Sequence, residues 1–122
     1  FKANNLVLIP EPYLIDPDYA SWLPRIFDLA VVLLLFHNEH ENAPDRVFTV
    51  DEWKLFLSGY KEYNALTDQE NQYWDKAMQH VFLDEVMWLM AEYEEDWQNP
   101  AQQKLFNSLI QIVIDSADYR LI

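Results

Sequence analysis

Helix-start signals at three positions constrain this 122-residue chain more than any other feature of its sequence. "TVDE" from Thr49 and "TDQE" from Thr67 both fit the capping box, in which a Thr and a Glu three residues later satisfy the free N–H groups of a first helical turn. "NPAQ" from Asn99 places an N-cap asparagine directly before a proline in the first helical position. The three signals predict helices over about 50–63, 67–97 and 100–117.

The beginning of the chain has a different pattern. "NLVLI" and "YLID", separated by "PEP", predict a two-stranded antiparallel ribbon of residues 5–9 and 13–16, and the prolines exclude a helix there. Pro24 then fits the first turn of a helix that would run to about Asn38. We therefore expect a mainly α fold in which a short β-hairpin is followed by about four packed helices.

Apolar residues recur at helical spacing in the two C-terminal helices, which is typical of core-facing stripes. In the first of these helices the stripe comprises Trp74, Met78, Val81, Phe82, Val86, Leu89 and Tyr93. In the last helix it comprises Leu105, Leu109, Ile112 and Val113. We interpret both stripes as parts of one hydrophobic core, and we see no sign of a second domain.

Composition excludes several classes of function. The longest uninterrupted apolar run, Leu29 to Phe36, is much shorter than the ~20 residues that span a bilayer. Cysteine is absent, which excludes disulfides and thiolate chemistry. Gly59 is the only glycine, so neither a dinucleotide-binding turn nor a phosphate-binding Walker loop can form. We expect a cytoplasmic protein with no membrane partner.

The charge balance also restricts the partners. The chain has 21 acidic and 8 basic residues, a net charge of −13. Nucleic-acid binding requires clustered Lys and Arg to neutralise phosphates, so we expect no nucleic-acid partner. The same charge is compatible with a cationic ligand or a basic protein surface, or with acidic faces that only keep an aromatic-rich domain in solution.

Three aspartates stand in the apolar segment "YLIDPDYASWLPRIFDLAVVLLLF": Asp16, Asp18 and Asp28. A carboxylate in such surroundings is costly unless a charged or hydrogen-bonding group meets it. Antiparallel pairing of the ribbon would bring Asn5, at the start of the first strand, close to Asp16, at the end of the second. Amide and carboxylate oxygens suit Mg²⁺, although Asn and Asp are also common turn and cap residues.

The stretch "NNLVLIPEPYLIDPDYASWLPRIFDLA" resembles the C-lobe of the aminoglycoside phosphotransferase and choline kinase-like family of small-molecule kinases. The matching elements are Asn5, "LIDPDYA" and "IFDLA", in the family's order and spacing, over roughly the first third of the chain. Pro17 departs from the Phe or Trp that most relatives have after the metal-binding Asp. The resemblance implies the C-lobe part of a protein-kinase-like (α+β) fold, with a metal-site ribbon over 1–19 and a helical subdomain over 20–122.

Within this resemblance, Asp16 would be the principal Mg²⁺ ligand and Asn5 the second. Asp28 would be buried beneath the site and would accept N–H groups of the catalytic loop, holding its shape. The alternative for Asp28 is a partly exposed helix residue paired with Arg25. Asp18 would assist the metal or the substrate, or would only stabilise a turn.

Acidic residues beside indoles form a weaker candidate site in the C-terminal helices. Relatives in the family use acids on such helices to line pockets for cationic substrates, and tryptophan faces also attract cations. A solvated helix face is the alternative. The candidate residues for a substrate pocket are Asp84, Glu85, Glu92 and Glu95.

Several parts of a complete kinase are not in these residues. The family's catalytic Asp would precede Phe1, as would the N-lobe and the Lys that binds the phosphates. The resemblance therefore predicts the C-terminal fragment of an ATP- and Mg²⁺-dependent phosphotransferase, with a small hydrophilic molecule as acceptor and the rest of the kinase as partner. We expect no activity from the 122 residues alone. The alternatives are a remnant that lost the reaction and a non-catalytic acidic helical module that binds a basic partner.

Overall fold

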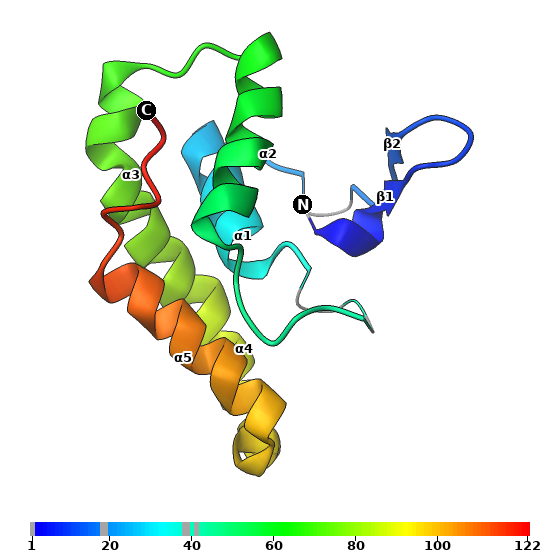
Figure 1. Cartoon of the computed structure of the whole chain (residues 1–122), viewed down its shortest axis with the longest axis vertical. Coiled ribbons are helices and arrows are strands. Elements are labelled where there is room, and N and C mark those ends of the chain that lie inside the picture. Colours follow the sequence, from blue (N-terminus) through cyan, green and yellow to red (C-terminus); the bar gives the residue numbers. More distant parts are fainter. Residues whose placement is uncertain (1, 18–19, 38–39, 41) are drawn as a thin grey trace.

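The computed structural model describes residues 2–17, 20–37, 40 and 42–122, which form a mainly helical fold with a short two-stranded sheet (Figure 1). In chain order the elements are the 3-10 turn η1 (Ala3–Asn5), β1 (Leu6–Val7), β2 (Tyr13–Leu14), α1 (Arg25–Leu35), α2 (Val50–Tyr63), α3 (Asp68–Val81), the π-helical turn η2 (Phe82–Val86), α4 (Met87–Glu92), the 3-10 turn η3 (Glu94–Gln98) and α5 (Pro100–Ile114). The expected mainly α fold with a short hairpin is confirmed, and α1, α2 and α5 lie where helices are predicted.

The helix starts follow the predicted caps. The Thr49 hydroxyl accepts the N–H of Glu52 at 3.3 Å, and the Glu52 carboxylate accepts the N–H of Thr49 at 2.7 Å. The Thr67 box makes the same reciprocal pair at the start of α3. Asn99 caps α5 by accepting the N–H of Ala101 at 3.0 Å. These local hydrogen bonds satisfy N–H groups that have no partner within the helix, and they fix where each helix begins.

The prediction of one helix over 67–97 is wrong. α4 ends at Glu92, and the chain turns at Tyr93 before η3 begins. The next three residues are acidic, and negative charge is unfavourable at the negative end of a helix dipole. The indole N–H of Trp97 also donates to the carbonyl of Met90 at 2.8 Å, so the reversed chain satisfies a carbonyl near the end of α4.

The core lies where α1 packs against α3 and the other helices close around them. Most predicted stripe positions are buried: Trp74, Met78, Val81, Val86, Leu105, Leu109 and Ile112. Phe82, Leu89 and Val113 are half-buried, whereas Tyr93 is exposed because the helix ends there.

An aromatic stack runs through this core from α3 to α2. The ring of Trp53 is nearly parallel to that of Trp74, with centroids 5.7 Å apart, and to that of Phe56, with centroids 5.6 Å apart. Tyr60 continues the series 6.3 Å from Phe56. Both tryptophans are fully buried, so the stack joins the centre of the core to the outer side of α2.

The C-terminal segment after α5 returns along α3 (Figure 1). The indole N–H of Trp74 donates to the carbonyl of Tyr119 at 2.7 Å, and the Tyr119 hydroxyl donates to the carbonyl of Phe48 at 2.9 Å. Leu121 is fully buried. The segment is therefore part of the core, although it has no regular secondary structure.

An ion pair ties the start of α1 to the start of α3. The Arg25 guanidinium donates to both carboxylate oxygens of Glu70, at 2.5 and 2.8 Å, and also to the carbonyl of Ala65. These hydrogen bonds from Arg25, with those from Thr67, lower the pKa of Glu70 to about 2. Arg46 and Thr49 lower the pKa of Glu52 to about 2 in the same way at the start of α2.

The two lowered pKa values predict a loss of stability in acid. Since the pKa of Glu70 falls from 4.5 to about 2 on folding, its contribution is complete above pH 4.5 and disappears as the pH approaches 2. Glu70→Gln keeps a capping residue but removes the charge. We expect the free energy of unfolding at neutral pH to fall by about 1 kcal/mol, a small value because the ion pair is partly exposed. We also expect the stability of the variant to decrease less steeply as the pH is lowered. Urea unfolding at a series of pH values measures both.

The matched control is Glu62→Gln, which removes an exposed carboxylate of α2 that pairs with none of the described residues. It should leave the stability at neutral pH, and its decrease in acid, close to those of the unmodified chain. An equal effect of the two substitutions would contradict the role assigned to the Arg25 pair.

Across the part of the chain that the structure describes, no helix combines the length and the apolar character needed to cross a membrane.

Candidate functional site

The β-ribbon brings the two predicted metal ligands to the same end of the hairpin. Leu6 pairs with Leu14 and Val7 with Tyr13 in antiparallel register. The N–H of Ile15 donates to the carbonyl of Asn5 at 2.8 Å, so the pairing continues past the regular strands. Asp16 is therefore one residue beyond the partner of Asn5. The antiparallel ribbon is confirmed, with strands shorter than the predicted 5–9 and 13–16.

Asp16 has an unusual backbone conformation. Its φ angle is +56°, in the left-handed region that residues other than glycine seldom adopt. Asp tolerates this region better than most residues, but such conformations concentrate at functional sites, where the surrounding structure holds them. The Asp16 side chain is exposed, so its carboxylate is open to a ligand.

Two hydrogen bonds position Asn5 and attach the ribbon to the helices. The Asn5 side-chain oxygen accepts the N–H of Lys2 at 3.3 Å. The N–H of Ala3 donates to the carbonyl of Phe36, just after α1, at 2.6 Å. In Figure 1 the hairpin lies to one side of the helices. These contacts place the candidate metal site beside the C-terminal end of α1.

The donor types suit a hard cation. Asn5 and Asp16 offer amide and carboxylate oxygens, the ligands that Mg²⁺ prefers. Among the described residues, no group of three or more His, Cys, Asp or Glu is placed to hold a metal. Mg²⁺ is commonly bound by one or two carboxylates together with waters and phosphates, so the small donor set is compatible with it. Asp18, the third candidate, lies outside the described residues.

Asp28 is exposed, and the expectation that this residue is buried is wrong for the described chain. Its apolar neighbours face the core, whereas Asp28 lies in the first turn of α1, where a solvated carboxylate interacts favourably with the positive end of the helix dipole. The predicted alternative pairing with Arg25 is also wrong, since Arg25 binds Glu70. Bracing of a catalytic loop by Asp28 stays a prediction, because that loop would precede Phe1.

The four acidic candidates for a substrate pocket are all exposed. Asp84 and Glu85 lie in η2, Glu92 ends α4, and Glu95 lies in η3. A cavity of about 270 Å³ lies nearby, lined by residues of α4, η3 and α5 that include Trp97. None of the four acids lines it. Their role in substrate binding stays a prediction.

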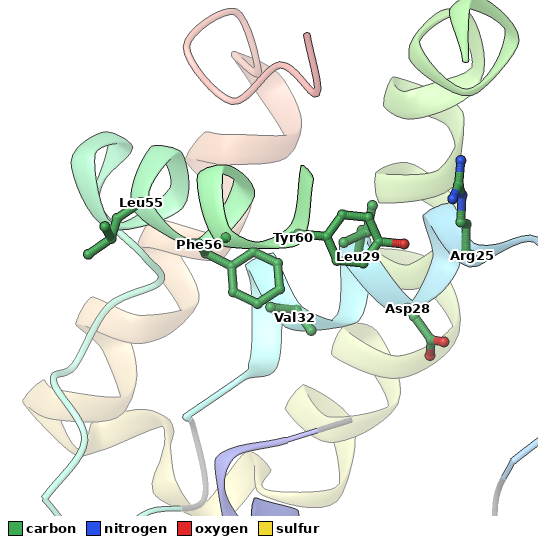
Figure 2. Close-up of a pocket in the computed structure, with 8 residues that line it drawn as sticks. Arg25, Asp28, Leu29, Val32, Leu55, Phe56 and Tyr60 are labelled. Carbon is green, nitrogen blue, oxygen red and sulfur yellow. The ribbon is translucent and has the colours of Figure 1, made fainter. Parts of the chain in front are cut away.

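A second cavity, of about 440 Å³, lies between α1 and α2 (Figure 2). The sequence alone does not predict this cavity, because it forms only when α1 and α2 are packed in the fold. One signal was present: Gly59, the single glycine, interrupts an otherwise strong helix and lines this cavity. Gly59 adds no side chain to the wall that α2 forms.

The comparisons with known proteins give no relatives: no family model matches the chain, and neither a curated protein nor a solved structure does.

Proposed function

We propose that these residues form the C-terminal part of a small-molecule kinase that transfers the γ-phosphate of ATP to a hydroxyl group. The observation that carries the proposal is the register of the ribbon, in which Asp16 lies one residue beyond the pairing partner of Asn5 and has a positive φ angle. Two oxygen-donating side chains at the open end of a hairpin suit a metal that is shared with phosphates. The motif resemblance from Asn5 to "IFDLA" supports the same reading.

In this proposal Asp16 is the main Mg²⁺ ligand and Asn5 the second, and bound Mg²⁺ would neutralise charge on the transferred phosphate. The left-handed backbone of Asp16 and the hydrogen bond from Ile15 to Asn5 orient the two donors. The catalytic Asp and the phosphate-binding Lys would come from residues before Phe1. The acceptor would be a small hydrophilic molecule.

The surface of the ribbon and of the following segment adds support. Leu8, Ile9, Tyr13, Leu14, Ile15, Trp22 and Leu23 are all exposed. Contiguous exposed apolar residues are typical of a surface that another part of a protein covers. The catalytic loop and the N-lobe of a kinase would provide that cover.

The test measures Mg²⁺-dependent ATP turnover by the gene product that contains this chain, with a panel of hydroxyl substrates. We expect Asp16→Asn to lose at least about 100-fold in turnover, because the carboxylate charge on the metal is lost. Glu11→Gln, a carboxylate at the turn of the same ribbon, is the matched control and should retain turnover. Circular dichroism checks that both variants fold.

Near-normal turnover in Asp16→Asn would disprove the metal assignment. A gene product without His-x-Asp next to Phe1, and without ATP turnover, would instead favour the alternative of an acidic interaction module. One observation favours that alternative: Leu83 and Trp88 are exposed beside Asp84 and Glu85, a combination that suits a basic amphipathic partner.

A further inference from the structure

The cavity between α1 and α2 has no part in the proposed phosphoryl transfer. Its volume of about 440 Å³ lies in the range of small-molecule sites. Leu29 and Val32 come from α1, and the aromatic rings of Phe56 and Tyr60 come from α2 (Figure 2). Phe56 is held by its stacking on the buried Trp53, so this part of the wall is fixed by the core.

The two charged residues of the cavity differ in what they offer a ligand. The guanidinium of Arg25 is already taken up by Glu70, at 2.5 and 2.8 Å, and by the carbonyl of Ala65. Asp28 makes no ion pair or side-chain hydrogen bond with any described residue. Figure 2 shows the two side chains extending in opposite directions. A ligand would therefore meet an unpaired negative charge beside apolar and aromatic walls.

At Gly59 no described residue fills the cavity beside α2. A Cβ atom added there would meet no described atom within 4 Å, apart from its chain neighbours and the backbone of its own helix. Glycine inside a helix costs roughly 1 kcal/mol relative to alanine, and here no crowding requires it. A larger side chain at this position would extend into the open space. The position therefore allows the cavity to be blocked without disturbing the packing.

We propose that this cavity binds a small organic cation with a flat apolar body. Its ammonium group would pair with the Asp28 carboxylate, and its ring would pack against Phe56 and Tyr60, where aromatic faces also attract a cation. The net charge of −13 raises the local concentration of cations near the chain. A neutral ligand of the same shape would gain the apolar contacts but not the charge pairing.

This inference stands apart from the proposed kinase function. The two uses of Asp28 exclude one another, because amide donors of a preceding catalytic loop would occupy the carboxylate oxygens that the cation needs. The 122-residue chain tests the cation site without such a loop. Failure of this site would not affect the roles of Asn5 and Asp16, whose test is ATP turnover.

The experiment titrates phenethylamine into the chain and follows the backbone amide signals by NMR. Phenylethanol, with a hydroxyl in place of the ammonium group, is the neutral comparison. We expect saturable shifts at Leu29, Gly59 and Tyr60, with the amine binding roughly fivefold more tightly than the alcohol, the size of an exposed ion pair. Asp28→Asn should remove this difference, and Gly59→Leu should abolish binding of both compounds.

Asp45→Asn is the charge control, because it removes an exposed carboxylate outside the cavity. It should leave the preference for the amine unchanged. The proposal is overturned by shifts that spread over other acidic surfaces, by an equal loss in Asp45→Asn and Asp28→Asn, or by the absence of saturable shifts at the cavity. If Gly59→Leu does not fold, the comparison of the two aspartates still decides.

Discussion

Replacing Trp53 by alanine is expected to lower the free energy of unfolding by about 4 kcal/mol, a large fraction of the ~5–15 kcal/mol that stabilises a typical domain. The indole is fully buried and stacks on Trp74 and on Phe56. Its removal leaves a cavity between α2 and α3 that these helices cannot close without moving. Chemical denaturation, followed by circular dichroism, measures the loss.

Trp22→Ala is the matched control for this prediction. Trp22 is fully exposed, so its removal should change the free energy of unfolding by less than about 0.5 kcal/mol. A loss below about 2 kcal/mol in Trp53→Ala would show that the stack is not the centre of the core. Trp53→Phe keeps one aromatic ring in the stack and should lose less than the alanine variant.

The second large effect is expected in the C-terminal segment. Leu121→Ala should lower the free energy of unfolding by about 3 kcal/mol, because the side chain is fully buried against the core although it lies outside any helix. The contacts of Tyr119 with Trp74 and Phe48 hold the segment in place, so the rest of the chain cannot easily collapse into the gap. Urea unfolding of the variant gives the value.

Its control is the neighbouring residue. Ile122 is 64% exposed, and Ile122→Ala should have an effect within about 0.5 kcal/mol. Equal effects of the two substitutions would mean that the segment does not dock in solution as it does in the structure. Comparing the two variants therefore separates the effect of burial from the effect of lying near the end of the chain.

Trp53 also connects stability with the cation site. Phe56 contributes one ring to the stack and also lines the cavity between α1 and α2. The orientation of this wall is therefore set from inside the core, and the cavity does not depend on a ligand for its shape. The ribbon differs in this respect, since Leu8, Ile9, Tyr13 and Leu14 are exposed and add nothing to the core.

Local features of the sequence determined the helix starts and the hairpin. A capping box needs only residues three positions apart, and the hydrogen bonds of Thr49 with Glu52 form as the spacing predicts. The proximity of Asn5 and Asp16 follows from antiparallel pairing across one short turn. The core stripes are also local, because their positions repeat along a single helix.

Only the tertiary structure decided the rest. Arg25 binds Glu70, 45 residues away, and no local spacing distinguishes this partner from Asp28. Asp28 is exposed because α1 packs against α3 with a particular rotation about its own axis. The apolar residues on either side of Asp28 do not specify that rotation. The end of α4 depends on Trp97 folding back on Met90, and the cavity at Gly59 exists only between two packed helices. Short-range hydrogen bonds are encoded in spacing, whereas the choice of long-range neighbours is made by packing the whole chain.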